Sequence, residues 1–101
     1  MIAAPKRSRI REKSLLLDRD ILIAQRRFRG QEFAQIASLF RISVSLACRR
    51  FNGIPERYRN SLERLVHYQQ AHYGDTDLPE HVLEPLRNRL KRFYGIVPED
   101  E

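Results

Sequence analysis

Arginine is the residue type whose abundance and placement in this 101-residue chain could do chemistry. Nineteen basic side chains outnumber 13 acidic ones, for a formal net charge of +6, and 16 of the 19 are arginines. The planar guanidinium group donates two parallel hydrogen bonds, which suits phosphate oxygens and the edge of a guanine base. Residues 1–59 hold 14 basic and 5 acidic residues, whereas residues 60–101 hold 5 and 8. This asymmetry indicates that the N-terminal part of the chain meets a polyanion.

Catalytic and metal-binding patterns are weak by comparison. His67, His72 and His81 have neither cysteine partners nor the spacing of metal ligands. No Ser-His-Asp order, glycine-rich phosphate loop or paired-carboxylate site stands out, so we expect a protein that is not an enzyme and needs no cofactor or metal. Cys48 is the single cysteine, which fits a reducing cytosol, and we interpret it as a passive small residue.

The spacing of apolar residues predicts an all-α fold of about five helices. The spacing Leu17, Ile21, Ala24 and Phe28 is helical, and Gly30 supplies a left-handed stop. A short helix over 32–40 and another over 43–52 follow. The residues expected to point inward are Phe33, Ile36, Ala37, Phe40, Ala47 and Phe51, with Val44 as a further candidate.

Two longer helices are expected in the C-terminal half. Pro55 suits the first position of a helix that ends at Gly74. The last helix is expected to open on a capping box of Asp77 and Glu80, to run to Gly95, and to kink or begin near Pro85. The longest apolar run is three leucines, and no signal peptide follows the basic N-terminus, so we expect a soluble cytoplasmic protein without a membrane segment.

The segment 30–51 carries the most specific pattern. Ala37 is small where two helices would cross closely, Ile42 would fill the core from the turn, and Ser43 would cap the second helix. With Gly30 before the first helix, Ile36 beside Ala37, and apolar Ala47 and Phe51, this segment resembles the helix-turn-helix superfamily. The resemblance is closest to the C-terminal module of bacterial sigma factors and to small phage, plasmid and transposase regulators.

The resemblance covers about a quarter of the chain and includes three departures. Arg41 occupies the turn position where the family favours glycine, so a left-handed conformation would fall on a residue with a Cβ atom. Ala47 is smaller than the usual valine, and Gln35 replaces the common glutamate.

The second helix of this motif would read the major groove of DNA. With Ala47 inward, a rotation of about 100° per residue places Ser45, Arg49 and Asn52 on the opposite face. Arg49 is the best candidate for a guanine and Asn52 for an adenine edge. The full predicted DNA-binding set is Ser43, Val44, Ser45, Leu46, Arg49, Arg50 and Asn52 on this helix, Gln31, Arg27 and Arg29 as phosphate contacts, and Lys6, Arg7, Arg9 and Arg11 in the N-terminal tail.

The chain therefore divides into three regions. Residues 1–13 are predicted to be a basic flexible arm, which either enters an adjacent minor groove or only solvates the chain. Residues 14–54 form the helix-turn-helix region. Residues 55–101 supply helices that either form a homodimer or complete the monomer core, and both alternatives stay open; the apolar stripe concerned is Leu62, Leu65, Val66, Leu83, Leu86, Leu90 and Phe93.

The expected function is that of a sequence-specific DNA-binding transcriptional regulator, a repressor or autoregulator of a mobile element or small operon. It would bind double-stranded DNA as a homodimer at the nucleoid in the cytoplasm. The alternatives are a protein-interaction module, such as an antitoxin or an adaptor for RNA polymerase, and a non-specific nucleic-acid binder.

Overall fold

The computed structural model describes the backbone of residues 6–96 and the side chains of residues 11–96. Within this range the chain forms helices and no strand, which confirms the predicted all-α fold of about five helices. None of these helices is both long and apolar enough to cross a membrane. The helices are α1 (Lys6–Phe28), α2 (Phe33–Phe40), α3 (Val44–Gly53), α4 (Glu56–Tyr73) and α5 (Glu80–Leu90).

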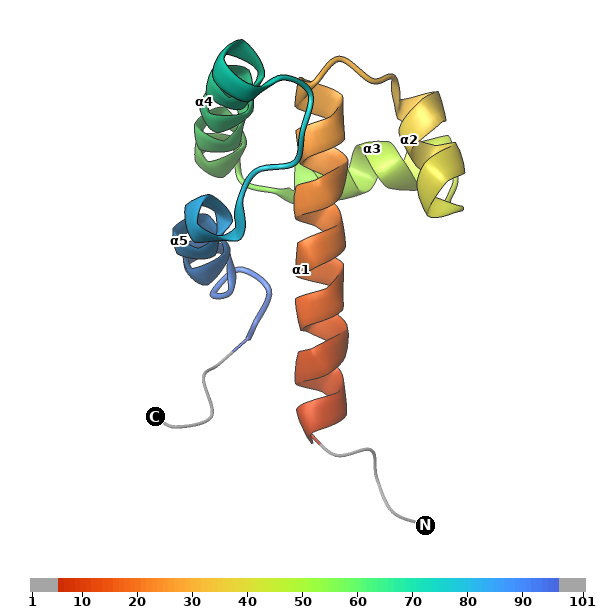
Figure 1. Cartoon of the computed structure of the whole chain (residues 1–101). Helices are drawn as coiled ribbons and strands as arrows, with labels where there is room; N and C mark the ends of the chain where they lie inside the picture. Colours follow the sequence, from red (N-terminus) through yellow and green to blue (C-terminus); the bar gives the residue numbers. More distant parts are fainter. Residues whose placement is uncertain (1–5, 97–101) are drawn as a thin grey trace.

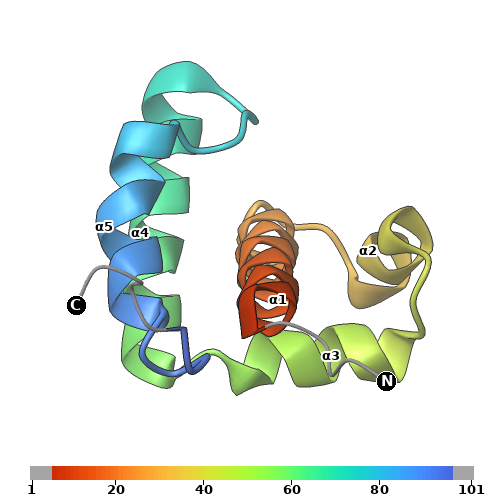
Figure 2. The same ribbon diagram turned by 90° about the horizontal axis from the view of Figure 1, so that it is seen from below.

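Helix α1 is the central element, and it contacts each of the other four helices. Viewed along α1, helices α2 and α3 lie on one side and below, and α4 and α5 lie on the other side (Figure 2). The N-terminal turns of α1 extend beyond the other helices (Figure 1). Because α1 separates the two helix pairs, it fixes the position of α3 relative to the C-terminal half.

The predicted start of the first helix is wrong. We expected residues 1–13 to be an irregular arm and the helix to begin near Leu17, but α1 begins at Lys6. The segment 6–13 lacks an apolar stripe, yet lysine, arginine and glutamate have high helix propensity, and a packed helix extends into such residues at little cost. The basic residues from Lys6 to Lys13 therefore stand on a helix.

The main core joins α1 to the C-terminal half. Leu17, Ile21 and Ala24 of α1 are buried against side chains of α4, α5 and their connections. Five of the seven residues predicted for a dimer interface belong to this core and are at most 6% exposed: Leu62, Val66, Leu83, Leu86 and Leu90. These five cannot meet a second chain while the fold is intact, so the alternative of core completion describes them. Leu65 is half-buried against the core, and Phe93 is 53% exposed.

The start and end of α5 also differ from expectation. The helix begins at Glu80 with Pro79 at the N-cap, and proline has no side chain that could accept a hydrogen bond. The predicted capping box is absent: Asp77 lies two residues before the cap and pairs with Arg29, and Glu80 pairs with Arg87. Pro85 lies inside the helix rather than starting it. The helix ends at Leu90, and a turn that includes Gly95 at φ 69° follows, so Phe93 leaves the predicted apolar stripe.

Candidate nucleic-acid interface

Helices α2 and α3 are joined by the short turn 41–43, and three buried residues hold them together. Ile36 and Ala47 are fully buried and Ala37 is 3% exposed, as the sequence pattern predicts. Ala37 and Ala47 carry only a methyl group each, which allows the two helices to approach closely. The pairing fixes α3 with one face inward and the opposite face toward solvent.

The turn has the left-handed residue that we expected. Arg41 adopts φ 56° and ψ 45° and follows α2 directly. Its N–H group donates to the carbonyl of Ser38, and the N–H group of Ile42 donates to the carbonyl of Ala37, at 3.3 and 3.0 Å. These two bonds satisfy carbonyls that the end of α2 would leave free, in the pattern of a Schellman motif. The turn therefore has one defined geometry despite the missing glycine.

Side chains cap the N-terminal ends of both helices. The hydroxyl oxygen of Ser43 accepts a hydrogen bond from the backbone N–H of Leu46 at 3.0 Å, which confirms the predicted cap of α3. At the start of α2, the side-chain oxygen of Gln35 accepts from the backbone N–H of Glu32 at 3.0 Å. Glutamine thus makes the reciprocal bond that a glutamate would make in this position.

The outward face of α3 carries the predicted reading residues. Ser45, Arg49 and Asn52 are exposed, opposite buried Ala47. Ser43 and Val44 are also exposed, and Val44, at 48%, does not point inward. Leu46 and Cys48 are half-buried at the flanks. The face therefore presents hydroxyl, guanidinium and amide groups that can form hydrogen bonds with base edges.

Arg50 is not part of this face, contrary to the prediction. Its guanidinium donates two hydrogen bonds to the carboxylate of Asp20, at 2.9 and 2.7 Å, and Asp20 is 1% exposed. The hydroxyl of Tyr94 donates to the same carboxylate. The hydrogen bond to Asp20 raises the pKa of Arg50, and burial together with the bond to Asp20 raises the pKa of the Tyr94 phenol well above its ordinary value. This network fastens α3 to α1 and to the turn after α5.

Sequence reasoning missed Asp20, although a signal was present. Asp20 lies within the helical stripe Leu17, Ile21 and Ala24, three residues after its first member. An acidic residue on an apolar stripe requires a buried partner, because an isolated buried charge is costly. Arg50 supplies it from the other side of the motif.

Of the arginines predicted to contact phosphates before α2, one is engaged in an ion pair and the other is exposed. The side chain of Arg29 is 11% exposed and pairs with Asp77 at 2.7 Å, so it is not available to a phosphate. Arg27 is exposed; its guanidinium lies 5.0 Å from the ring centre of Phe33 and donates to the backbone carbonyl of Gln31. Gln31 is half-buried. Of the predicted tail residues, Arg11 is exposed, and the side chains of Lys6, Arg7 and Arg9 lie outside the described residues.

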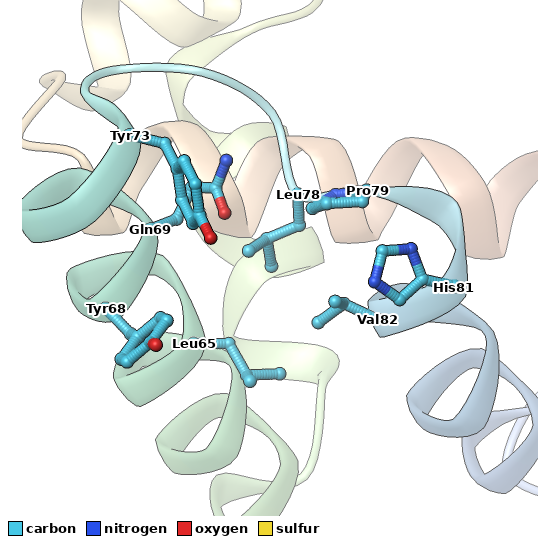
Figure 3. A pocket seen from close by; sticks show the side chains of 8 residues that line it. All are labelled: Leu65, Tyr68, Gln69, Tyr73, Leu78, Pro79, His81 and Val82. Carbon is cyan, nitrogen blue, oxygen red and sulfur yellow. The ribbon is translucent and has the colours of Figure 1, made fainter.

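A separate apolar pocket lies away from the motif, between the end of α4 and the start of α5 (Figure 3). Its volume is about 330 Å³, and Leu65, Leu78 and Val82 point toward its centre. Tyr68 and Tyr73 at its rim are 60% and 69% exposed. The pocket shares no lining residue with α3.

The chain was compared with protein-family models, curated proteins and solved structures, and none of the three comparisons finds a match.

Proposed function

We propose that the protein is a sequence-specific double-stranded DNA-binding transcriptional regulator of the helix-turn-helix class, which reads the major groove with α3. The observation that carries this proposal is the outward face of α3. Ser45, Arg49 and Asn52 stand opposite buried Ala47, on a helix fixed by the Ser43 cap and by the bond between Arg50 and Asp20. A rigid helix with exposed groups that can bond to base edges is what major-groove recognition requires.

Each side chain has a role in the proposal. The guanidinium of Arg49 donates to the O6 and N7 atoms of a guanine, and the amide of Asn52 bonds the edge of an adenine. Arg27 and the basic side chains of the first turns of α1 contact phosphates and supply affinity that does not depend on sequence. The proposal includes no catalytic activity and no cofactor, and it places the protein on nucleoid DNA in the cytoplasm.

The mode of regulation that we propose is repression or autoregulation by a homodimer. A single reading helix contacts few base pairs, and two copies on an inverted repeat double the contacts. The two copies would meet through a surface other than the five buried residues of the predicted stripe, because those side chains pack within one chain.

One observation favours a second function, that of a protein-interaction module such as an antitoxin or an RNA polymerase adaptor. Tyr68 and Tyr73 are exposed beside the apolar pocket, and exposed aromatic side chains at an apolar surface are typical of protein interfaces. This function would use the C-terminal half and would give the outward face of α3 no role. A DNA-binding test therefore distinguishes the two candidate functions.

The test is selection from a library of random DNA duplexes by the full chain, followed by sequencing of the bound duplexes. We expect enrichment of one motif that contains guanine, and loss of the preference at that base pair in the Arg49→Ala variant. Enrichment of no motif would contradict the proposal and leave a non-specific binder or a protein-interaction module.

A further inference from the structure

A cavity lies between α4 and the end of α5, and half of its lining residues are arginines. It has a volume of about 550 Å³, and an adjoining cavity of about 310 Å³ shares Arg57, Tyr58 and Arg89 with it. We name the larger cavity the arginine groove, lined by Arg57, Tyr58, Asn88, Arg89, Arg92 and Phe93.

Aromatic rings position one of the three cations without neutralising it. The guanidinium of Arg57 lies 4.9 Å from the ring centre of Tyr58 and 5.8 Å from that of Phe93. The two rings meet edge to face at 5.4 Å, and Arg57 also donates a hydrogen bond to the Tyr58 hydroxyl. A cation held over rings keeps its full charge and most of its donors for an anion.

The described ion pairs leave the groove positive. They engage Arg29, Arg50 and Arg87, whereas Arg57, Arg89 and Arg92 have no carboxylate partner among the described side chains. Acidic and basic residues are also separated along α5 and the turn that follows it. Glu80 and Glu84 lie in the first half of α5, and Arg87, Arg89, Lys91 and Arg92 gather at and after its end. Among the described residues of the C-terminal half, the end of α5 and the turn after it are therefore basic, whereas Glu99, Asp100 and Glu101 lie outside the described residues.

The groove adjoins the reading helix. Phe93 lines both the arginine groove and a second cavity of about 330 Å³, whose lining includes Lys13 of α1 and Arg49 and Gly53 of α3. The turn after α5 lies beside the junction of α3 and α4 (Figure 2). The cavity that Arg49 lines, which also includes the bonded pair of Arg50 and Asp20, therefore adjoins the arginine groove at Phe93.

We propose that the arginine groove binds backbone phosphates of the DNA next to the base pairs that α3 reads, which rests on the proposed function. A helix in the major groove brings its flanks close to the phosphates that border the groove, and guanidinium groups match phosphate geometry. The open groove and its exposed cations suit an extended polyanion that contacts several of them at once. The C-terminal half is thus part of the DNA-binding surface, although its net charge indicates the opposite.

The test compares Arg92→Gln and the double variant Arg89→Gln/Arg92→Gln with Arg64→Gln. Arg64 is an exposed arginine of α4 that lines none of the described cavities, so its variant is a matched control for the loss of one charge. Affinity is measured for the selected duplex and for a scrambled duplex over a series of salt concentrations. We expect the slope of log affinity against log salt to fall by about 1 for each groove arginine removed, with equal losses on both duplexes. Arg64→Gln should keep the wild-type slope.

The outcomes separate this inference from the proposed function. Selective binding by the wild type, with an unchanged slope in the double variant, would reject the groove and leave the proposed function intact. Absence of selective binding by the wild type would reject both. Inorganic phosphate, titrated at constant ionic strength, tests whether the groove serves a small anion instead. Saturable phosphate binding that Arg92→Gln abolishes, without an effect of this variant on DNA, would also overturn the inference.

Discussion

Arg49 and Arg50 are adjacent, carry the same charge and lie on the same helix, but their surroundings give them different roles. Arg49 is exposed on the outward face of α3. Arg50 turns toward α1 and bonds buried Asp20 through two hydrogen bonds. The pair therefore offers a matched test, because equal substitutions should affect two different properties.

We expect Arg49→Ala to weaken binding to the selected duplex by about 1–3 kcal/mol, the value of one bidentate base contact. Its thermal stability and far-UV helical signal should match those of the wild type, because the side chain has no described partner in the fold. A titration with selected and scrambled duplexes measures the effect. Unchanged discrimination would remove Arg49 from the reading face.

Arg50→Ala should instead reduce the free energy of unfolding by about 3 kcal/mol, because it leaves the buried Asp20 carboxylate without its cationic partner. Denaturant unfolding of the two variants side by side measures the difference. Equal stability of the two variants would show that the bond between Arg50 and Asp20 does not hold α3 in place.

Tyr94 gives the same network a dependence on pH. Burial and the bond to Asp20 raise the pKa of its phenol above the ordinary value of 10.0. Above about pH 10 the unfolded chain loses the Tyr94 proton, whereas the folded chain keeps it. The contribution of Tyr94 to the free energy of unfolding should therefore be fully present below about pH 10 and should be lost progressively at higher pH. The free energy of unfolding, measured from about pH 8 to 11, should decline less steeply with pH for Tyr94→Phe than for the wild type. Identical slopes would exclude this contribution.

At the scale of elements, the ends of α1 and α2 can be compared directly. Both α1 and α2 end in the same hydrogen-bond pattern, with Gly30 at φ 102° in one and Arg41 at φ 56° in the other. Glycine adopts this conformation freely, whereas a residue with a Cβ atom is strained by about 1–2 kcal/mol. The turn between α2 and α3 thus stores strain at Arg41.

Arg41→Gly should therefore stabilise the fold by about 0.5–1 kcal/mol, once the greater freedom of glycine in the unfolded chain is subtracted. Arg41→Ala removes the same charge and keeps the strain, so it is the control. Thermal unfolding of both variants measures the effect. A glycine variant no more stable than the alanine variant would show that the turn is not strained.

The first turns of α1 allow a separate prediction. Deletion of residues 1–13 removes five basic side chains. We expect weaker binding to all duplexes alike and a flatter salt dependence, because phosphate contacts carry no sequence preference. Mobility shifts at several salt concentrations test this. Unchanged affinity and slope would assign these residues to solvation alone.

The elements also indicate how far sequence reasoning reaches. Apolar spacing and turn residues predict all five helices, the left-handed Arg41 and the cap at Ser43, because these depend on local geometry. They do not predict that Arg29 pairs with Asp77 or that Arg50 pairs with Asp20, because these partners are 48 and 30 residues away in the sequence. Nor do they predict the arginine groove, which assembles from α4 and the end of α5.

At the scale of the whole molecule, the C-terminal helices are part of the fold that carries α3. Leu90 is fully buried in the core that α1 shares with α4 and α5, whereas Phe93 is 53% exposed beyond the end of α5. The two positions distinguish a core role from an interface role for the apolar stripe.

We expect Leu90→Asp to unfold the chain, because a carboxylate without a partner in the core costs more than about 4 kcal/mol. Phe93→Asp should remain folded. Circular dichroism and sedimentation of both variants decide the question. A folded Leu90→Asp variant that only lowers the mass of a dimer would instead place this side chain in an interface between chains.

The central claim is that α3 reads base sequence, and the ratio of two affinities tests it most directly. Binding of the full chain to the selected duplex and to a scrambled duplex of equal length should be measured from low to physiological salt. We predict that both affinities fall with salt while the selected duplex stays at least about 10³-fold tighter at physiological salt. A ratio near one at every salt concentration would contradict the claim, because it would show that charge alone accounts for binding.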